Sequence, residues 1–176
     1  MVSLDLLSSL DGLLWLQSGK KVGALFQQHQ TTVSRNQKKC AQVFGIKLFK
    51  HKRRWSTIGD QTLLQHERKV HQVARLQGKS RLRIEVNGCL DSPYFNPPPS
   101  GWVVGTGNNL SDPHGIQYLR QHIVDVCLCP LTDLPAESED LTIIPLNINS
   151  EVGFVMLQQH ANQERIIGLV NTLKQM

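Results

Sequence analysis

Between residues 30 and 54 the sequence carries side chains that can form hydrogen bonds and ion pairs with a polyanion. They fall in two groups, a polar and basic segment at 30–38 and a basic cluster at 50–54. Cationic side chains bind phosphate groups, whereas short polar side chains and arginine recognise the edges of bases. The pattern therefore predicts a DNA-binding surface made of Gln30, Thr31, Thr32, Ser34, Arg35, Lys38, Lys50, Lys52, Arg53 and Arg54.

The residue types suggest separate roles within this surface. We expect Arg35 to bind a guanine edge or a phosphate, and Gln30 and Thr32 to contact bases. Ser34 and Lys38 suit phosphates, and the basic cluster suits phosphates or the minor groove. An ordinary solvated helix and hairpin is the alternative interpretation, but the charge coincides with a helix-turn-helix pattern, which favours DNA.

A helix and a hairpin are needed to position these side chains. The first group falls on a predicted helix, 31–44, whose apolar residues recur at helical spacing, although Gln37 interrupts the stripe. The basic cluster lies at the tip of a predicted hairpin, 46–57. A periodic apolar helix at 3–17 and a short helix up to Phe26 come before them. This order is typical of a winged helix-turn-helix.

Another helix follows, capped by Thr57 or Asp60 and ending near residue 76, with a linker at 77–80. Its apolar stripe either packs against the first helix or joins two chains. Because dimeric helix-turn-helix proteins read two half-sites, we expect a homodimer. The residues predicted to form the dimer contact are Leu63, Val70, Val73 and Leu76.

The second half of the chain reads as an α/β domain. Strands are predicted at 81–86, 102–104, 124–129, 141–146 and 152–157, and helices at 115–123 and 162–174. Strands that alternate with helices favour a small, mostly parallel sheet. The predicted fold class is therefore multi-domain α/β, with a winged helix-turn-helix domain at 1–58, a linker and dimerisation helix at 59–80, and an effector-like domain at 81–176.

The charge is divided in the same way as the elements. Residues 1–80 carry 14 Lys+Arg against 4 Asp+Glu, a net +10, and residues 81–176 carry 5 against 10, a net −5. A basic half beside an acidic one indicates that only the first half meets a polyanion. Apolar runs are too short to span a bilayer. The four cysteines do not make a disulfide framework in a chain of 176 residues, so we expect a reduced cytoplasmic location and no membrane association.

Other chemical motifs have plainer interpretations. Cys127 and Cys129 share one face of a strand, and small buried side chains explain them better than a redox pair does. His66 and His71 are five apart, so they do not share a helix face for one metal ion. Residues 105–107, Gly-Thr-Gly, suit a turn better than a nucleotide loop. No nucleophile and base are paired by spacing, so we expect no enzyme, no cofactor and no metal.

In this order the residues resemble the LysR-type transcriptional regulators. The resemblance covers about the first 86 residues and is carried by Thr-Val-Ser-Arg at 32–35, Phe-Gly-Ile-Lys-Leu-Phe at 44–49, Thr57 and the strand at 82–86. It implies a winged helix-turn-helix and a linker helix that pairs two subunits. It also implies an effector domain shaped like a periplasmic binding protein. The implied partners are double-stranded DNA, a second subunit and a small-molecule effector.

The second half departs from that family. Its effector domains have two lobes around a ligand cleft, whereas residues 81–160 resemble one lobe, and the segment from 151 leads directly to the last helix. Residues 92–100, SPYFNPPPS, replace a helix. We therefore expect a shortened, single-lobe effector domain in a dimeric regulator that reads major-groove half-sites with 31–44 and 46–57. The alternative is a regulator-derived interaction module that dimerises without specific DNA binding.

Overall fold

The structure, a computed structural model, describes residues 1–52, 54–86, 95, 97–106, 114–146 and 151–174. The chain forms two compact units, Met1–Val73 and Ala74–Met176. The division falls inside one helix, whereas the predicted boundaries at 58 and 80 lie on either side of it. None of the helices among the described residues is long and apolar enough to span a membrane.

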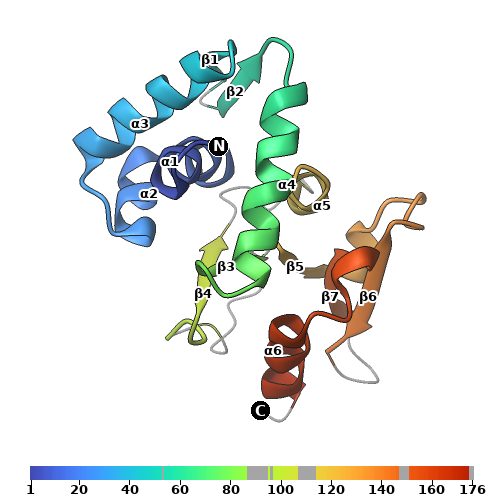
Figure 1. The fold of residues 1–176 in the computed structure, drawn as a ribbon. Coiled ribbons are helices and arrows are strands. Elements are labelled where there is room, and N and C mark those ends of the chain that lie inside the picture. Colours follow the sequence, from blue (N-terminus) through green and yellow to red (C-terminus); the bar gives the residue numbers. More distant parts are fainter. Residues whose placement is uncertain (53, 87–94, 96, 107–113, 147–150, 175–176) are drawn as a thin grey trace. The chain divides into compact units, whose positions relative to one another are not determined.

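The first unit contains three helices, a two-stranded hairpin and most of a fourth helix (Figure 1). Its core forms where α1, α3 and α4 bring together Leu7, Leu10, Cys40 and Leu64. Gly12 allows α2 to approach α1, since a Cβ atom there would lie 2.9 Å from Cε2 of Phe26. The elements are α1 (Leu4–Leu16), α2 (Gly19–Phe26), α3 (Gln30–Val43), β1 (Lys47–His51), β2 (Arg54–Ile58) and α4 (Thr62–Leu76).

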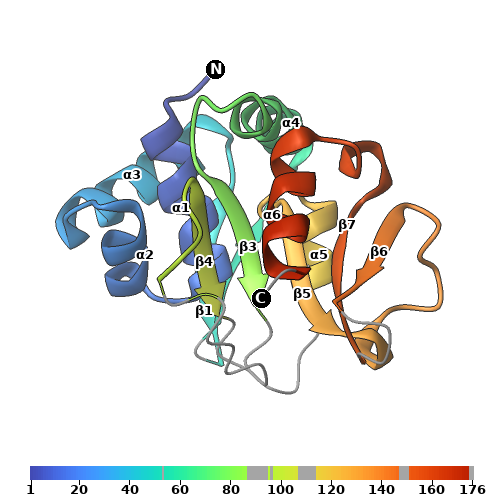
Figure 2. The ribbon, with the colours of Figure 1, turned by 90° about the horizontal axis from the view of Figure 1, so that it is seen from below.

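The second unit is a five-stranded sheet with two helices, and its strand order is β4-β3-β5-β7-β6. Figure 2 shows these strands side by side. The elements are β3 (Leu82–Val86), β4 (Trp102–Thr106), α5 (His114–Arg120), β5 (Val126–Pro130), β6 (Leu141–Pro145), β7 (Val152–Leu157) and α6 (Glu164–Lys174), with short 3-10 turns at Leu131–Asp133 and Gln158–His160.

Helices α5 and α6 cover opposite faces of this sheet. Ile166 and Leu169 of α6 pack in one core with Val126 and Leu128 of β5. Gly115 of α5 instead lies against the sulfur of Cys127. Since neighbouring residues of a strand point to opposite faces, the two helices lie on different sides.

The α/β class is confirmed, but the expectation of a mostly parallel sheet is wrong. β3 pairs in parallel with β4 and β5, whereas β7 is antiparallel to both β5 and β6, so the sheet is mixed. The short connection between Pro145 and Val152 explains the antiparallel β6–β7 pair, because a parallel crossover needs a dozen or more residues. The antiparallel β5–β7 pair joins strands that are not consecutive in the chain. Most of the irregular segment 87–101, and Gly107 of the glycine turn, lie outside the described residues.

Candidate nucleic-acid interface

Helix α3 begins with a histidine cap. His29 has extended backbone angles, and its Nδ1 accepts a hydrogen bond from the backbone N–H of Thr31 at 3.4 Å. The Thr31 hydroxyl lies 2.8 Å from the same nitrogen. A side-chain acceptor at this position satisfies one of the free N–H groups at the helix start. The cap therefore fixes where the first turn of α3 begins.

The two sides of α3 differ in character. Val33, Gln37, Cys40 and Ala41 are buried against the rest of the unit. The defect predicted at Gln37 thus lies in the core, where its Oε1 has no hydrogen-bond partner among the described residues. Such an unpaired buried acceptor is destabilising.

The outer side of α3 presents one polar and basic row. Thr31, Arg35, Lys38 and Gln42 are spaced four, three and four residues apart and are all exposed. That spacing places them on one helix face. A single face that combines an arginine, a lysine and two short polar or amide groups can contact both phosphates and base edges.

The remaining predicted residues of α3 lie beside this row. Gln30 and Thr32 are exposed, whereas Ser34 is half-buried. Sequence reasoning did not include Lys39 and Gln42 in the surface, although both are exposed. Gln42 could have been found from its helical spacing, since it lies seven residues after Arg35.

A small polar network holds the turn between α2 and α3. The hydroxyl of Ser9, fully buried on α1, lies 2.8 Å from Oε1 of Gln28 in the turn. Asn36 on α3 donates to the same oxygen at 3.4 Å. The backbone N–H of Gln28 donates to the carbonyl of Gly23 at 2.8 Å. These contacts connect three helices and so orient α3.

The basic residues of the hairpin differ in their exposure to solvent. Lys50 and Lys52 are exposed, and Arg54 is half-buried. Lys52 has a φ of 45°, which is common at a tight hairpin tip. The ammonium of Lys50 lies 5.5 Å from the ring centroid of Trp55, its cross-strand neighbour. Arg53 lies outside the described residues.

Gln17 connects the hairpin to the helices. Its backbone is left-handed, with a φ of 59°, and it caps α1. Its side-chain amide donates to the carbonyl of Trp55 at 3.3 Å and accepts from the Trp55 backbone N–H. A two-way bond of this kind holds β2 at a set distance from α1. The sequence gives no sign of this contact, because the two residues are 38 positions apart.

Helix α4 carries apolar side chains on its outer face. Leu63, Val70 and Val73 are 68%, 49% and 46% exposed. Leu76, predicted to belong with them, is buried in the core of the second unit, so it is not part of this exposed face.

The inner face of α4 carries buried charges as well as core leucines. In the first unit Arg68 forms a fully buried ion pair with Asp11 of α1, at 2.7 Å. In the second unit Arg75 forms another with Asp125, at 2.8 Å. These ion pairs lie beside buried leucines of the same helix, Leu64 in the core of the first unit and Leu76 in the core of the second.

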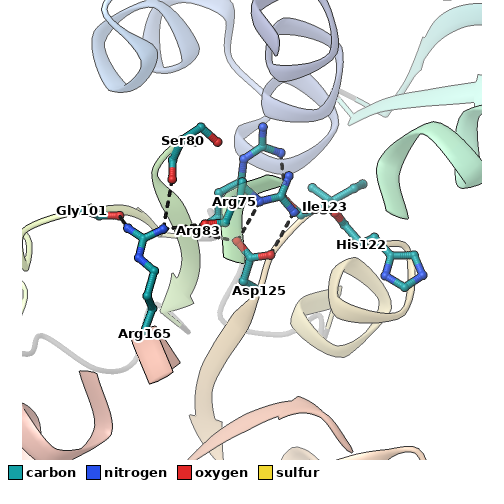
Figure 3. Close-up of polar contacts among 8 residues, drawn as sticks. All are labelled: Arg75, Ser80, Arg83, Gly101, His122, Ile123, Asp125 and Arg165. Carbon is teal, nitrogen blue, oxygen red and sulfur yellow. Dashed lines mark hydrogen bonds and ion pairs between the residues drawn. The ribbon is translucent and has the colours of Figure 1, made fainter. Parts of the chain in front are cut away.

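The Arg75–Asp125 pair belongs to a larger buried network (Figure 3). Arg75 donates two hydrogen bonds to Asp125, and the backbone N–H of Arg83 donates a third at 2.9 Å. Arg165 of α6 donates to the backbone carbonyls of Arg75, Ser80 and Gly101. Together these bonds fasten the last turn of α4 to the start of β3 within the second unit.

The cysteine and histidine motifs noted in the sequence are largely buried. Cys127 and Cys129 are buried free thiols. His71 is buried beside Glu67, at 3.2 Å, whereas His66 is exposed. Within the described part of the chain no group of three or more His, Cys, Asp or Glu side chains could hold a metal ion.

Neither a family model nor a curated protein matches the sequence. Solved structures do resemble it. Full-length OxyR C199D from Pseudomonas aeruginosa shares 16% identity over 82% of this chain and 53% of its own, with a TM-score of 0.42. CrgA, a LysR-type transcriptional regulator from Neisseria meningitidis, shares 15% over 84% and 54%, with a TM-score of 0.31. Full-length CbnR complexed with its target DNA shares 11% over 83% and 56%, with a TM-score of 0.33.

The LysR-type regulators indicated by the sequence are thus found again among the similar solved structures. The chain spans about half the length of these structures. At these identities the match is a similarity of fold.

Proposed function

We propose that the chain is a DNA-binding transcriptional regulator of the LysR type, which acts in the cytoplasm as a homodimer. The observation that supports this most directly is the exposed row of Thr31, Arg35, Lys38 and Gln42 on α3. In this proposal the row enters the major groove, with Arg35 at a guanine edge or a phosphate.

The hairpin supplies the second contact in this proposal. Lys50 and Lys52 are exposed, and the sequence places Arg53 and Arg54 next to them. Cations at a hairpin tip beside the recognition helix suit phosphates or the minor groove. The Gln17–Trp55 contact supports this role, because it connects the hairpin to the same helices that orient α3.

The proposed dimer forms through the outer face of α4. Leu63, Val70 and Val73 expose aliphatic surface that a second copy of the helix would bury. Because the inner face of α4 is already occupied by core leucines and ion pairs, its outer face is the one left for a partner.

The first test uses DNA selected by the chain from randomised duplexes. We expect the selected sites to contain two half-sites separated by a whole number of helical turns. Arg35→Ala should remove the preference for the selected site in a gel shift, at a loss of about 1–3 kcal/mol per half-site. Arg35→Lys should restore binding if the contact is to phosphate, but not if it is bidentate to guanine. Unchanged binding by Arg35→Ala would show that α3 is not the reading helix.

The matched control is Arg53→Ala. A phosphate contact carries no sequence information, so this variant should weaken selected and unrelated duplexes alike. The slope of log binding constant against log salt concentration should become less steep by about one unit in this variant. If Arg53→Ala instead lost its preference for the selected site, the hairpin would be the element that contacts the bases.

The second test concerns the dimer. Val70→Glu places a charge in the middle of the apolar face of α4, at a position already 49% exposed, so the fold should be retained. We expect the mass measured by light scattering to fall from that of a dimer to that of a monomer. Lys69→Glu, a neighbouring exposed position outside the apolar face, is the control and should leave the dimer intact. A wild-type chain that is already monomeric at micromolar concentration would contradict the proposal.

An interaction module without specific DNA binding is the second candidate. The exposed apolar face of α4 supports dimerisation in either case. A chain that dimerises but enriches no sequence from randomised duplexes would favour this candidate over the regulator.

A further inference from the structure

The side chain of His29 makes two contacts with the residue that begins the exposed row of α3. Its Nδ1 accepts a hydrogen bond from the backbone N–H of Thr31 at 3.4 Å, and the Thr31 hydroxyl oxygen lies 2.8 Å from the same nitrogen. His29 and Thr31 are both exposed, so the pair lies on the surface of the first unit. These contacts therefore fix hydrogen-bonding groups that a partner of α3 would meet.

The backbone contact decides where the imidazole proton lies. A backbone N–H can only donate, so the Nδ1 atom that receives it carries no hydrogen of its own. The proton of the neutral ring is then on Nε2. At 2.8 Å a hydrogen atom lies between the Thr31 oxygen and this nitrogen, and the hydroxyl is the group that supplies it.

This arrangement leaves the Thr31 hydroxyl with one hydrogen-bonding role toward a partner. A threonine hydroxyl has one hydrogen to donate and two lone pairs that accept. Because the hydrogen of Thr31 is used in the contact with His29, only the lone pairs remain. A hydroxyl without such a contact can rotate and either donate or accept, so it distinguishes poorly between a donor and an acceptor on a base. His29 thus makes Thr31 an acceptor.

Thr31 occupies a position from which a recognition helix contacts bases. Helix α3 begins at Gln30, so Thr31 lies in its first turn, on the same face as Arg35 and Lys38. In helix-turn-helix proteins the N-terminal residues of the recognition helix contact base edges in the major groove. There adenine and cytosine present an amino donor where guanine and thymine present a carbonyl acceptor.

We propose that His29 is a positioning residue for sequence recognition, which makes Thr31 select the amino group of an adenine or a cytosine over the carbonyl group of a guanine or a thymine. The inference rests on the proposed function, since it requires α3 to enter the major groove. The selection is between bases of the same size, because adenine and guanine, or cytosine and thymine, differ in the group at this place. His29 acts through Thr31 and makes no contact with the DNA in this proposal.

A residue that only capped the helix would have a different effect. His29 accepts a hydrogen bond from an N–H group at the start of α3, so its removal also weakens the helix start. That loss lowers the affinity for every duplex by the same factor. The ratio of affinities for two duplexes that differ in the amino or carbonyl group instead reports the hydrogen bond of Thr31.

The test first locates the base pair that Thr31 contacts. Wild type and Thr31→Val each select sites from randomised duplexes, and the position at which only wild type shows a preference identifies the pair. We expect an adenine or a cytosine there. For an adenine, a duplex with adenine·thymine is compared with one carrying hypoxanthine·cytosine, which keeps the minor-groove pattern and replaces the amino group by a carbonyl. For a cytosine, the matched duplexes carry cytosine·hypoxanthine and uracil·adenine.

The ratio of the two affinities should separate the variants. Wild type should bind the duplex with the amino group more tightly by roughly 2- to 10-fold, as one hydrogen bond allows. Thr31→Val should bind both duplexes equally, because it has no hydroxyl. His29→Ala should also bind them equally, because its Thr31 hydroxyl can rotate and donate to the carbonyl. His29→Asn keeps a capping oxygen that can accept from both groups of Thr31, so it should retain the preference.

Two results would overturn the inference while leaving the proposed function intact. One is a selected site in which Thr31→Val changes no base preference. The other is a His29→Ala chain that favours the duplex with the amino group as strongly as wild type does. If no sequence is enriched from randomised duplexes, the proposed function fails and the inference fails with it.

Discussion

Replacing Asp125 by asparagine tests how the end of α4 is held in the second unit. The Asp125 carboxylate accepts two hydrogen bonds from Arg75, at 2.8 and 2.9 Å, and one from the Arg83 backbone N–H at 2.9 Å. Asparagine keeps the shape of the side chain. It removes the negative charge and turns one acceptor into a donor that faces the Arg75 guanidinium.

The expected cost follows from burial. The side chains of Arg75 and Asp125 are 2% and 1% exposed, so the variant leaves a buried charge without its counter-ion. Breaking such a pair from one side costs about 3–5 kcal/mol. The matched control is Asp140→Asn, which removes an equally bidentate contact with Arg120. Those side chains are 46% and 41% exposed, and solvent screening reduces the expected loss to about 0.5 kcal/mol.

Urea titration of chains labelled with 5-fluorotryptophan measures this difference unit by unit. Trp102 is buried in the core of the second unit, whereas Trp15 and Trp55 lie in the first. With an unfolding slope of about 2 kcal/mol/M, Asp125→Asn should shift the Trp102 transition by roughly 2 M. A shift no larger than that of Asp140→Asn would refute the reasoning, because it would mean that burial adds nothing to the importance of the pair.

Two further predictions concern the turn before α3 and the effect of acid. Gly23→Ala should destabilise the first unit by about 2–3 kcal/mol in urea unfolding, because its Cβ would lie 2.6 Å from the Gln28 carbonyl oxygen. The control is Gly19→Ala, which should be nearly neutral because the space around Gly19 is open. Burial lowers the pKa of His160 from 6.5, so the unfolded chain binds this proton more tightly and stability falls as the pH drops below 6.5. His160→Gln should lose less stability than wild type between about pH 7.5 and pH 5.5, and equal losses would contradict this origin.

Local periodicity explains why the elements could be predicted. The apolar spacing of residues 3–17 and 31–44 appears in the structure as α1 and α3, within a residue or two at each end. The strands predicted at 141–146 and 152–157 appear as β6 and β7. A helix or strand buries one face, and the spacing of its apolar residues records that face.

Strand direction and side-chain partners could not be predicted in the same way. Parallel and antiparallel sheets use strands of the same composition. The short connection between β6 and β7 explains one antiparallel pair, but the pairing of β7 with β5 depends on the tertiary structure. Gln17 reads as a residue just past a helix, yet its amide positions the hairpin by pairing with Trp55. Contacts of this kind depend on which distant segment is close in space.

Helix α4 separates what the sequence determines from what the tertiary structure decides. The sequence alone predicts a helix that starts after Thr57 or Asp60 and ends near residue 76, with Leu63, Val70 and Val73 on one face. Tertiary structure decides which face is inside, and that face holds Arg68 and Arg75 as well as Leu64 and Leu76. Arg68 and Arg75 find their counter-ions in Asp11 and Asp125, which are 57 and 50 residues away. Burying an arginine is tolerated only beside such a partner, and those partners are set by the tertiary structure, which leaves Leu63, Val70 and Val73 exposed.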